Sequence, residues 1–168
     1  TNVFSNLGEP VVIVSELAQG KFLNALSDTG RFLVNSTVGL VGLFDVASMI
    51  GLEKHNEDFG QTFGYWGFDS GPYLMLPFFG PSTVRDASGL VSTFLAPVSD
   101  LEPLGYIDND VVYYSANGLK YTDIRADLIP QEDMITGDRY GFIRSLYLQR
   151  RDYLVNDGEV EDDFGDDD

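Results

Sequence analysis

The 168-residue sequence contains no cysteine. Disulfide frameworks, thiolate zinc sites and cysteine nucleophiles are therefore excluded. Basic residues are also scarce, since 10 lysines and arginines stand against 27 aspartates and glutamates and leave a net charge of −17. Because binding to phosphates needs clustered lysine and arginine, we expect no nucleic-acid partner and no docking on anionic headgroups through a basic patch. Any membrane contact would have to be apolar.

Histidine occurs once, at His55, in the segment EKHNED beside Glu53, Glu57 and Asp58. Carboxylates could ligate a metal with this imidazole or orient it for acid–base work, but we expect a solvated histidine on a polar loop and no metal site. The sequence also lacks a Gly-x-Ser-x-Gly nucleophile turn and a phosphate-binding Gly-x-x-x-x-Gly-Lys loop. No catalytic residue and no cofactor is predicted.

The charge is unevenly distributed along the chain. The last 12 residues carry eight acids and no base, whereas residues 1–156 carry 19 acids and 10 bases. Blocks of like charge are usually solvated and disordered, so residues 157–168 are predicted to be a disordered acidic tail. No repeat and no Ser- or Gly-rich linker divides the remainder, and residues 1–156 are predicted to form one all-α domain.

Several segments carry helix signals. At the start, Asn6 is a candidate cap, Glu9 stands three residues on as in a capping box, and Gly20 is a plausible stop. The segment 21–37 has residues near helical spacing, and 57–67 is a candidate short helix. The remaining expectations are a helix over 82–96 capped by Ser82, a loop over 98–110 and a segment over 111–114 that fits either strand or helix.

The clearest amphipathic pattern lies near the end of the chain and predicts a helix over 142–155. Arg144, Arg151 and Asp152 lie largely off its apolar stripe, and Asn156 and Gly158 offer a stop. The stripe consists of Phe142, Ile143, Leu146, Tyr147, Tyr153 and Leu154.

The segment 38–51 is almost entirely apolar, with Asp45 and Ser48 as its only clearly polar residues. At 14 residues it is too short to span a bilayer, which takes about 20. Two interpretations stay open, a buried core helix and a helix lying in a membrane interface. The missing lysines and arginines argue against the second, because interfacial helices usually carry them on the polar face.

The segment 63–86 holds seven aromatic residues, four glycines and three prolines in 24 residues. Its glycines and prolines argue against one continuous helix. The lack of strict polar–apolar alternation argues against an ordinary half-buried strand. The segment is nevertheless too apolar for a solvated loop.

Four runs of the sequence carry a resemblance to a known family. They read FLVNSTVGLVGLFDVA, DFGQTFGYWG, GPYLMLPFFGPSTVRD and YLQRRDYLVNDG. In this order they resemble the MlaA (VacJ) family, the phospholipid-transport lipoproteins of the Gram-negative outer membrane, over nearly all of residues 1–158. Family members begin with a lipoprotein signal, a lipidated cysteine and a further helical segment, so the resemblance implies that this chain is either a fragment or a member whose start is not represented.

The resemblance implies a mostly helical, ring-like body seated in the periplasmic leaflet of the outer membrane. A polar channel through the ring would take mislocalised phospholipid from the outer leaflet and so maintain lipid asymmetry. The implied partners are phospholipid, an outer-membrane porin trimer and the soluble periplasmic carrier MlaC. No catalysis is implied. Two alternatives stay open, a soluble periplasmic helical interaction domain and a lipid hydrolase that uses His55 with a nearby carboxylate.

Irregular backbone at membrane depth survives only where it is buried in protein or lines a wet cavity, so the segment 63–86 fits the wall of such a channel. Charges beside it should turn inward, because an unpaired charge at membrane depth is costly. For Arg85 and Asp86 the simpler hypothesis is a solvated pair in the first turn of a helix. The channel candidates are Asp69, Arg85, Asp86, Tyr65 and Tyr73. The membrane-contact candidates are Val38, Leu40, Leu43, Phe44, Val46, Ile50 and Trp66.

Overall fold

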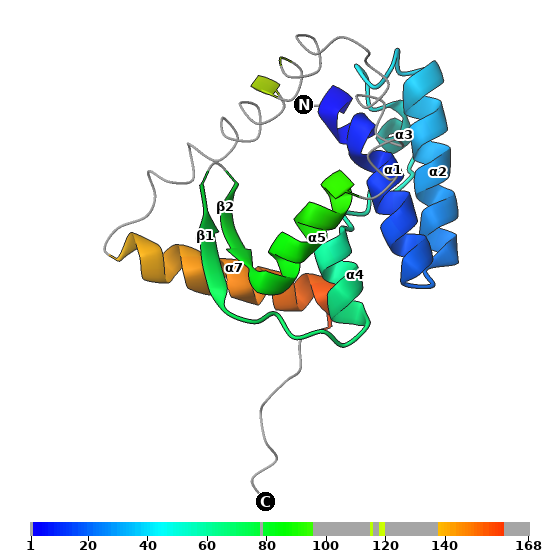
Figure 1. Ribbon diagram of the computed structural model, residues 1–168. Coiled ribbons are helices and arrows are strands. Elements are labelled where there is room, and N and C mark those ends of the chain that lie inside the picture. Colours follow the sequence, from blue (N-terminus) through cyan, green and yellow to red (C-terminus); the bar gives the residue numbers. More distant parts are fainter. Residues whose placement is uncertain (1, 78, 96–114, 116–117, 120–137, 160–168) are drawn as a thin grey trace, which may run out of the picture.

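The computed structural model describes residues 2–77, 79–95, 115, 118–119 and 138–159 (Figure 1). These residues are mostly helical, with one small antiparallel sheet. The prediction of a helical domain is confirmed, and the all-α prediction is corrected by the sheet. The expectations for 98–110, for 111–114 and for the tail beyond 159 lie outside the described residues. In chain order the elements are α1 (Asn2–Ala18), α2 (Phe22–Thr37), α3 (Val46–Met49), α4 (Phe59–Tyr65), β1 (Tyr73–Leu76), β2 (Gly80–Thr83), α5 (Val84–Leu95) and α7 (Arg139–Val155).

Helices α1 and α2 form an antiparallel pair along one side of the molecule (Figure 1). The predicted stop between them is confirmed, because Gly20 has a φ of 78° that suits glycine. The predicted cap is wrong, since α1 already begins at Asn2. Asn6 lies inside the helix, and its side chain donates to Ser36 Oγ at 3.0 Å instead of accepting from the first turn. Pro10 also lies within α1.

The segment 38–51 is neither of the two helices considered for it. After α2 ends at Thr37, the backbone turns through positive φ angles at Leu40, Val41 and Gly42, and only the four-residue α3 follows. The turn is tight, because a Cβ on Gly39 would lie 2.3 Å from the Phe44 carbonyl oxygen. Most of its large apolar side chains are exposed, whereas Ala47 is buried.

The aromatic segment 63–86 contains the end of α4 and the hairpin of β1 and β2. The prediction against strand is wrong for eight residues, because each backbone finds its partners in the other strand, from Tyr73 opposite Thr83 to Leu76 opposite Gly80. Asp58 caps α4 by accepting from the Gln61 backbone N–H at 2.8 Å. At the start of α5 the Thr83 hydroxyl, rather than that of Ser82, accepts from the Asp86 backbone N–H at 3.2 Å.

Helix α7 is longer than the predicted 142–155 because Asp138 caps it, accepting from the Gly141 backbone N–H at 3.1 Å. Its apolar stripe is not its buried face. Arg151 is the buried residue of this helix, whereas Phe142 and Leu146 are exposed. The arginine is drawn inwards by carboxylates on other elements, as described below.

Across the described residues, too, polar side chains are buried and large apolar side chains are exposed. Only three hydrophobic side chains are fully buried, namely Val11, Ala25 and Ala47, against fourteen polar or charged residues. Twenty-four large hydrophobic side chains are exposed. Soluble proteins rarely bury Asp, Glu or Arg, and they show large apolar patches mainly at binding surfaces. None of the described helices has the length and apolar character needed to cross a membrane.

The α4–α5 contact depends on two glycines, and it is central to the fold because α4 also touches α1 and α7 (Figure 1). A Cβ on Gly89 would lie 2.3 Å from the Gly60 nitrogen. We predict that Gly89→Ala forces the helices apart and lowers the free energy of unfolding by about 1–3 kcal/mol, as overpacking usually does. Chemical unfolding in detergent, followed by circular dichroism, measures this change.

Gly8→Ala is the matched control, because a Cβ on Gly8, within α1, meets no atom within 4 Å. Alanine there should leave stability unchanged or raise it by about 0.5–1 kcal/mol. Equal losses in the two variants would show that the close approach of α4 and α5 is unimportant.

Candidate functional site

Arg151 is the buried centre of an ion-pair network in which Asp86 is also buried and Asp58 is partly exposed. One of its terminal nitrogens lies 2.6 Å from Asp58 Oδ2, and the other lies 2.9 Å from Asp58 Oδ1 and 2.8 Å from Asp86 Oδ1. Tyr147, one turn earlier on α7, donates its hydroxyl to Asp86 Oδ2 at 2.7 Å. The network therefore joins α7 to the cap of α4 and to the first turn of α5.

The charges of this network stabilise one another. Burial alone would raise the pKa of Asp58 and of Asp86, but the Arg151 guanidinium holds both below their ordinary value. The two carboxylates in turn raise the pKa of Arg151, although burial opposes this. Burial and the hydrogen bond to Asp86 raise the pKa of Tyr147. At neutral pH both acids and the arginine are charged.

Three of the channel candidates belong to or touch this network, namely Asp86, which binds Arg151 and Tyr147, together with Arg85 and Tyr73. Arg85 is buried, and its Nε lies 3.3 Å from Asp86 Oδ1, so the hypothesis of a solvated first-turn pair is wrong. Tyr73 packs its ring against Tyr147, with centroids 6.1 Å apart. Asp69 is exposed and stands apart from the network. A lipid-facing role for these side chains stays a prediction.

Tyr65, the remaining channel candidate, is exposed near the end of α4, and the Lys21 ammonium lies 5.9 Å from its ring centroid. Most membrane-contact candidates are exposed too, with Leu40 at 58% and Leu43 at 60%. Val38, Phe44, Ile50 and Trp66 are also exposed, and Val46 is half-buried. Trp66 donates its indole N–H to the Ala18 carbonyl at 3.0 Å.

A second polar cluster lies between α1, α2 and α3. Arg31 is buried and donates to Asp45 Oδ1 at 3.2 Å, to Ser48 Oγ at 3.1 Å and to the Leu52 carbonyl. Asn35 donates to Asp45 Oδ1 at 3.0 Å. Although burial acts against it, hydrogen bonds from Ser48 and Asn35 lower the pKa of Asp45 to about 2.

His55 adjoins this cluster. It is not solvated among the acids of its own loop, because its Nδ1 lies 2.9 Å from Asp28 Oδ2 on α2 and 3.7 Å from Glu16 Oε1 on α1. The acids nearest in sequence have other contacts: Glu57 binds Lys21 and Gln19, and Asp58 binds Arg151.

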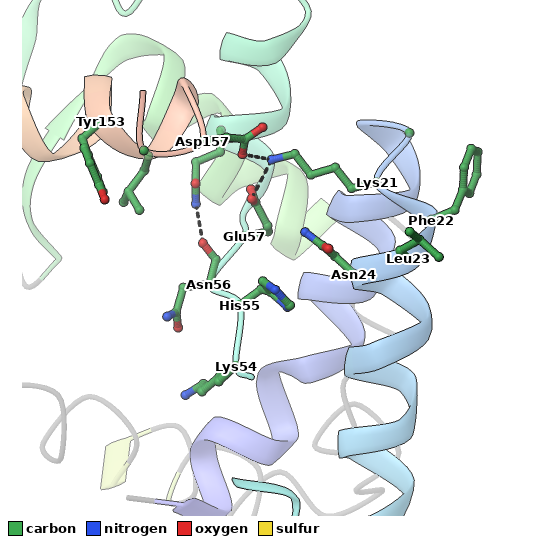
Figure 2. Close-up of a pocket in the computed structure, with 14 residues that line it drawn as sticks. Lys21, Phe22, Leu23, Asn24, Lys54, His55, Asn56, Glu57, Tyr153 and Asp157 are labelled. Atoms are coloured by element: carbon green, nitrogen blue, oxygen red, sulfur yellow. Dashed lines mark hydrogen bonds and ion pairs between the residues drawn. The ribbon is translucent and has the colours of Figure 1, made fainter. Parts of the chain in front are cut away.

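A cavity of about 800 Å³ opens between the α1–α2 turn, the segment 54–57 and the end of α7. Figure 2 shows Lys21 reaching towards Glu57 and Asp157, and the Lys21 Nζ lies 2.9 Å from Glu57 Oε1. His55, two residues before Glu57, also lines the cavity. The complete lining is Gly20, Lys21, Phe22, Leu23, Asn24, Lys54, His55, Asn56, Glu57, Gln61, Tyr153, Leu154, Asp157 and Gly158.

The lining of the cavity carries charges of both signs. Lys21 and Lys54 are its cations and Glu57 and Asp157 its anions, and Lys21 is paired with both acids. The volume is typical of a small-molecule site. Sequence reasoning missed this cavity because its walls come from distant segments. One signal was available, since these two lysines are among only three in the chain.

The sequence profile of the MlaA lipoprotein family matches residues 1–154. The chain is 32% identical to the intermembrane phospholipid transport system lipoprotein MlaA of Shigella flexneri and 31% identical to that of Escherichia coli strain K12. Both matches cover 96% of this chain but 64% of the relative, so the chain spans less than two thirds of their length. An uncharacterized protein of Rickettsia prowazekii is 33% identical, covering 90% of this chain and 60% of its own.

A solved structure reported as the structural basis for maintenance of bacterial outer membrane lipid asymmetry has a similar fold. Its TM-score is 0.71 at 30% sequence identity, and the match covers 92% of this chain and 77% of that chain. The names of these relatives describe transport of phospholipid rather than a chemical reaction.

The ion-pair network makes a testable prediction about stability. Arg151→Leu leaves Asp58 and Asp86 without their cation, so unfolding should become easier by about 3–5 kcal/mol. Thermal and chemical unfolding in detergent measure the loss. Adding Asp86→Asn to the same chain should restore part of it, because one uncompensated buried charge is then removed.

The neighbouring Arg150→Leu is the control, because Arg150 is exposed and should change stability by only about 0.5 kcal/mol. The acid side of the stability profile gives a second check. Because the pKa values of Asp58 and Asp86 are lowered, their contribution is present above the ordinary value of 3.8 and is lost as the pH falls through their folded pKa. If Arg151→Leu loses stability at acid pH in the same way as the unaltered chain, Arg151 does not lower the pKa values of Asp58 and Asp86.

Proposed function

This chain belongs to the MlaA lipoprotein family, and from that membership we propose that it moves phospholipid at the bacterial outer membrane. It would remove mislocalised phospholipid from the outer leaflet, pass it to a periplasmic carrier of the MlaC type and so maintain lipid asymmetry. An outer-membrane porin trimer is the proposed membrane partner. The lipid is moved and not cleaved, so the proposal assigns no catalytic residue.

The inverted polarity of the described residues is the observation that carries this proposal. Fourteen polar or charged residues are buried, and 24 large hydrophobic side chains are exposed. This is the distribution expected when the outer surface meets hydrocarbon and the polar groups face one another or water. An aqueous interaction domain with such a surface would aggregate, which favours the membrane proposal over the soluble alternative.

A seat in one leaflet agrees with the lengths of the elements. The described helices are too short or too polar to cross a bilayer, but an apolar outer face can sink into the periplasmic leaflet without spanning it. The turn and short helix of residues 38–50 would supply part of that face. A ring with a polar channel would let the headgroup pass through protein while the acyl chains stay in lipid.

The cavity beside Lys21 and Lys54 would hold the headgroup on this path. Its charged lining meets the exposed side chains of Phe22 and Leu23 at the α1–α2 turn, where acyl chains could leave the protein. The hydrolase alternative receives no support here, because the polar contacts of His55 within the described residues are with carboxylates rather than with a hydroxyl nucleophile.

Membrane seating is tested by Leu40→Asp combined with Leu43→Asp. Both side chains are exposed, and aspartate tolerates the positive φ of Leu40, so the fold should persist. A charge at membrane depth costs about 2.5–3.5 kcal/mol on insertion scales, so the variant should partition into liposomes at least about tenfold less. Flotation of liposomes with bound protein measures the partition.

The uncharged pair Leu40→Asn and Leu43→Asn is the matched control. It keeps a similar backbone preference without adding charge, and it should lose less binding than the aspartate pair. If the aspartate pair floats with liposomes as well as the unaltered chain does, this face does not contact lipid.

The headgroup site is tested by Lys54→Gln. Removing a charged hydrogen-bond donor should cost about 1.5–3 kcal/mol of headgroup binding, which corresponds to a tenfold or greater loss. Transfer of a fluorescent phospholipid from proteoliposomes to the soluble carrier measures it. Arg150→Gln, which removes one positive charge from an exposed site outside the cavity, is the control. Equal transfer by the two variants would refute the headgroup site while leaving the family's transport role open.

A further inference from the structure

We propose that Glu16, Asp28 and His55 form a binding site for a divalent transition-metal ion, with Zn²⁺ as the best-suited ion. The three residues come from α1, from α2 and from the segment between α3 and α4. The site does not depend on the proposed transport function.

The geometry brings one ligand atom from each residue to a common point. The imidazole nitrogen and the two carboxylate oxygens all lie within 4.8 Å of one another. His55 Nδ1 lies 2.9 Å from Asp28 Oδ2 and 3.7 Å from Glu16 Oε1. Tetrahedral zinc with bonds of about 2.1 Å holds its ligand atoms roughly 3.4 Å apart, so small side-chain adjustments would complete the site.

Both carboxylates are buried, and three of their four oxygens lack a hydrogen-bond partner, which is the second observation. Glu16 and Asp28 are both 0% exposed. Neither carboxylate oxygen of Glu16 has a hydrogen-bond partner, and Asp28 Oδ1 has none either. A buried carboxylate without a partner is costly, so these atoms call for a positive group that the side chains do not supply.

The nearest cations are committed elsewhere. The two terminal nitrogens of Arg31 donate to Asp45, to Ser48 and to the Leu52 carbonyl, and only its Nε approaches Asp28 Oδ1, at 3.6 Å. Lys54 donates to Ser5. A divalent cation would neutralise Glu16 and Asp28 together and would replace the missing partners.

The donor set selects the class of ion. One imidazole and two carboxylates suit zinc and similar divalent transition metals, whereas Mg²⁺ and Ca²⁺ prefer oxygen ligands alone. Access is available, because His55 is only partly buried and lines the 800 Å³ cavity shown in Figure 2. Three protein ligands leave a fourth position for water from that cavity.

A shared proton is the competing explanation. Burial and the neighbouring Asp28 raise the pKa of Glu16 to about 8, so a proton could neutralise part of the cluster near neutral pH. The two explanations differ in what Zn²⁺ does to the protein. Zn²⁺ would displace the proton and link α1, α2 and His55. A cluster that is neutralised by a proton alone would not bind Zn²⁺.

The test uses the full chain in detergent, without a polyhistidine tag and after dialysis against a chelator. We expect about one Zn²⁺ per chain by elemental analysis and calorimetry, and a higher Tm when Zn²⁺ is added. Co²⁺ should give visible absorption bands typical of a site with a nitrogen ligand. His55→Ala and Glu16→Gln should each weaken Zn²⁺ binding by about 10–100-fold or more.

Glu53→Gln is the matched control, because it removes an exposed acid from the same segment and should leave Zn²⁺ binding intact. Glu16→Gln also keeps the test clear of folding defects, since removing a buried charge should not lower the Tm of the metal-free chain. Zn²⁺ binding that survives His55→Ala, as the acidic end of the chain alone would give, overturns the site. The site is also overturned if Zn²⁺ does not change the Tm while Glu16→Gln raises it. That result would establish the shared proton.

Discussion

The contact between the Arg151 guanidinium and the carboxylates of Asp58 and Asp86 determines where α7 lies. Asp58 is 93 residues away in sequence and Asp86 is 65, so one side chain joins three elements that the chain itself does not hold together. The planar fork of arginine donates to two carboxylates with fixed geometry. Tyr147 stands one turn before Arg151 on the same helix face and donates to Asp86, which fixes the rotation of the helix. Phe142 and Leu146, on the apolar stripe of α7, are exposed as a consequence.

In the proposed membrane seat such a contact can dominate, because the usual driving force for folding would be weak there. The hydrophobic effect stabilises a fold when apolar groups leave water, and it offers little when the surrounding medium is hydrocarbon. Ionic and hydrogen-bonded pairs in a low-dielectric interior gain strength under the same conditions. A fold with only three fully buried hydrophobic side chains among its described residues therefore has to be held by its polar interior. Close helix contacts through small residues, as between Gly60 and Gly89, add the packing that such a fold can still use.

The proposed hydrocarbon surroundings also explain which features the sequence could predict. Local signals do not depend on the solvent, so Gly20 as a stop and the short α4 were found from turn chemistry and spacing. The apolar stripe of α7 identified a helix, but a stripe says which face is buried only if the solvent is water. The cost of an unpaired charge predicted that Arg85, Asp86 and Asp69 would turn inward. Arg85 and Asp86 do pair, whereas Asp69 is exposed. His55 was compared with acids of its own loop, whereas its partners lie 27 and 39 positions away on two other helices.

Residues 55–58 connect three polar groupings among the described residues. His55 faces the carboxylates of Glu16 and Asp28, Glu57 binds Lys21 across the cavity, and Asp58 binds Arg151. These contacts follow one another within four residues of a segment that has no regular secondary structure. A shift of the segment by one residue would break all three, because each side chain has a different partner element. The cavity, the acid cluster and the position of α7 are therefore linked through this segment.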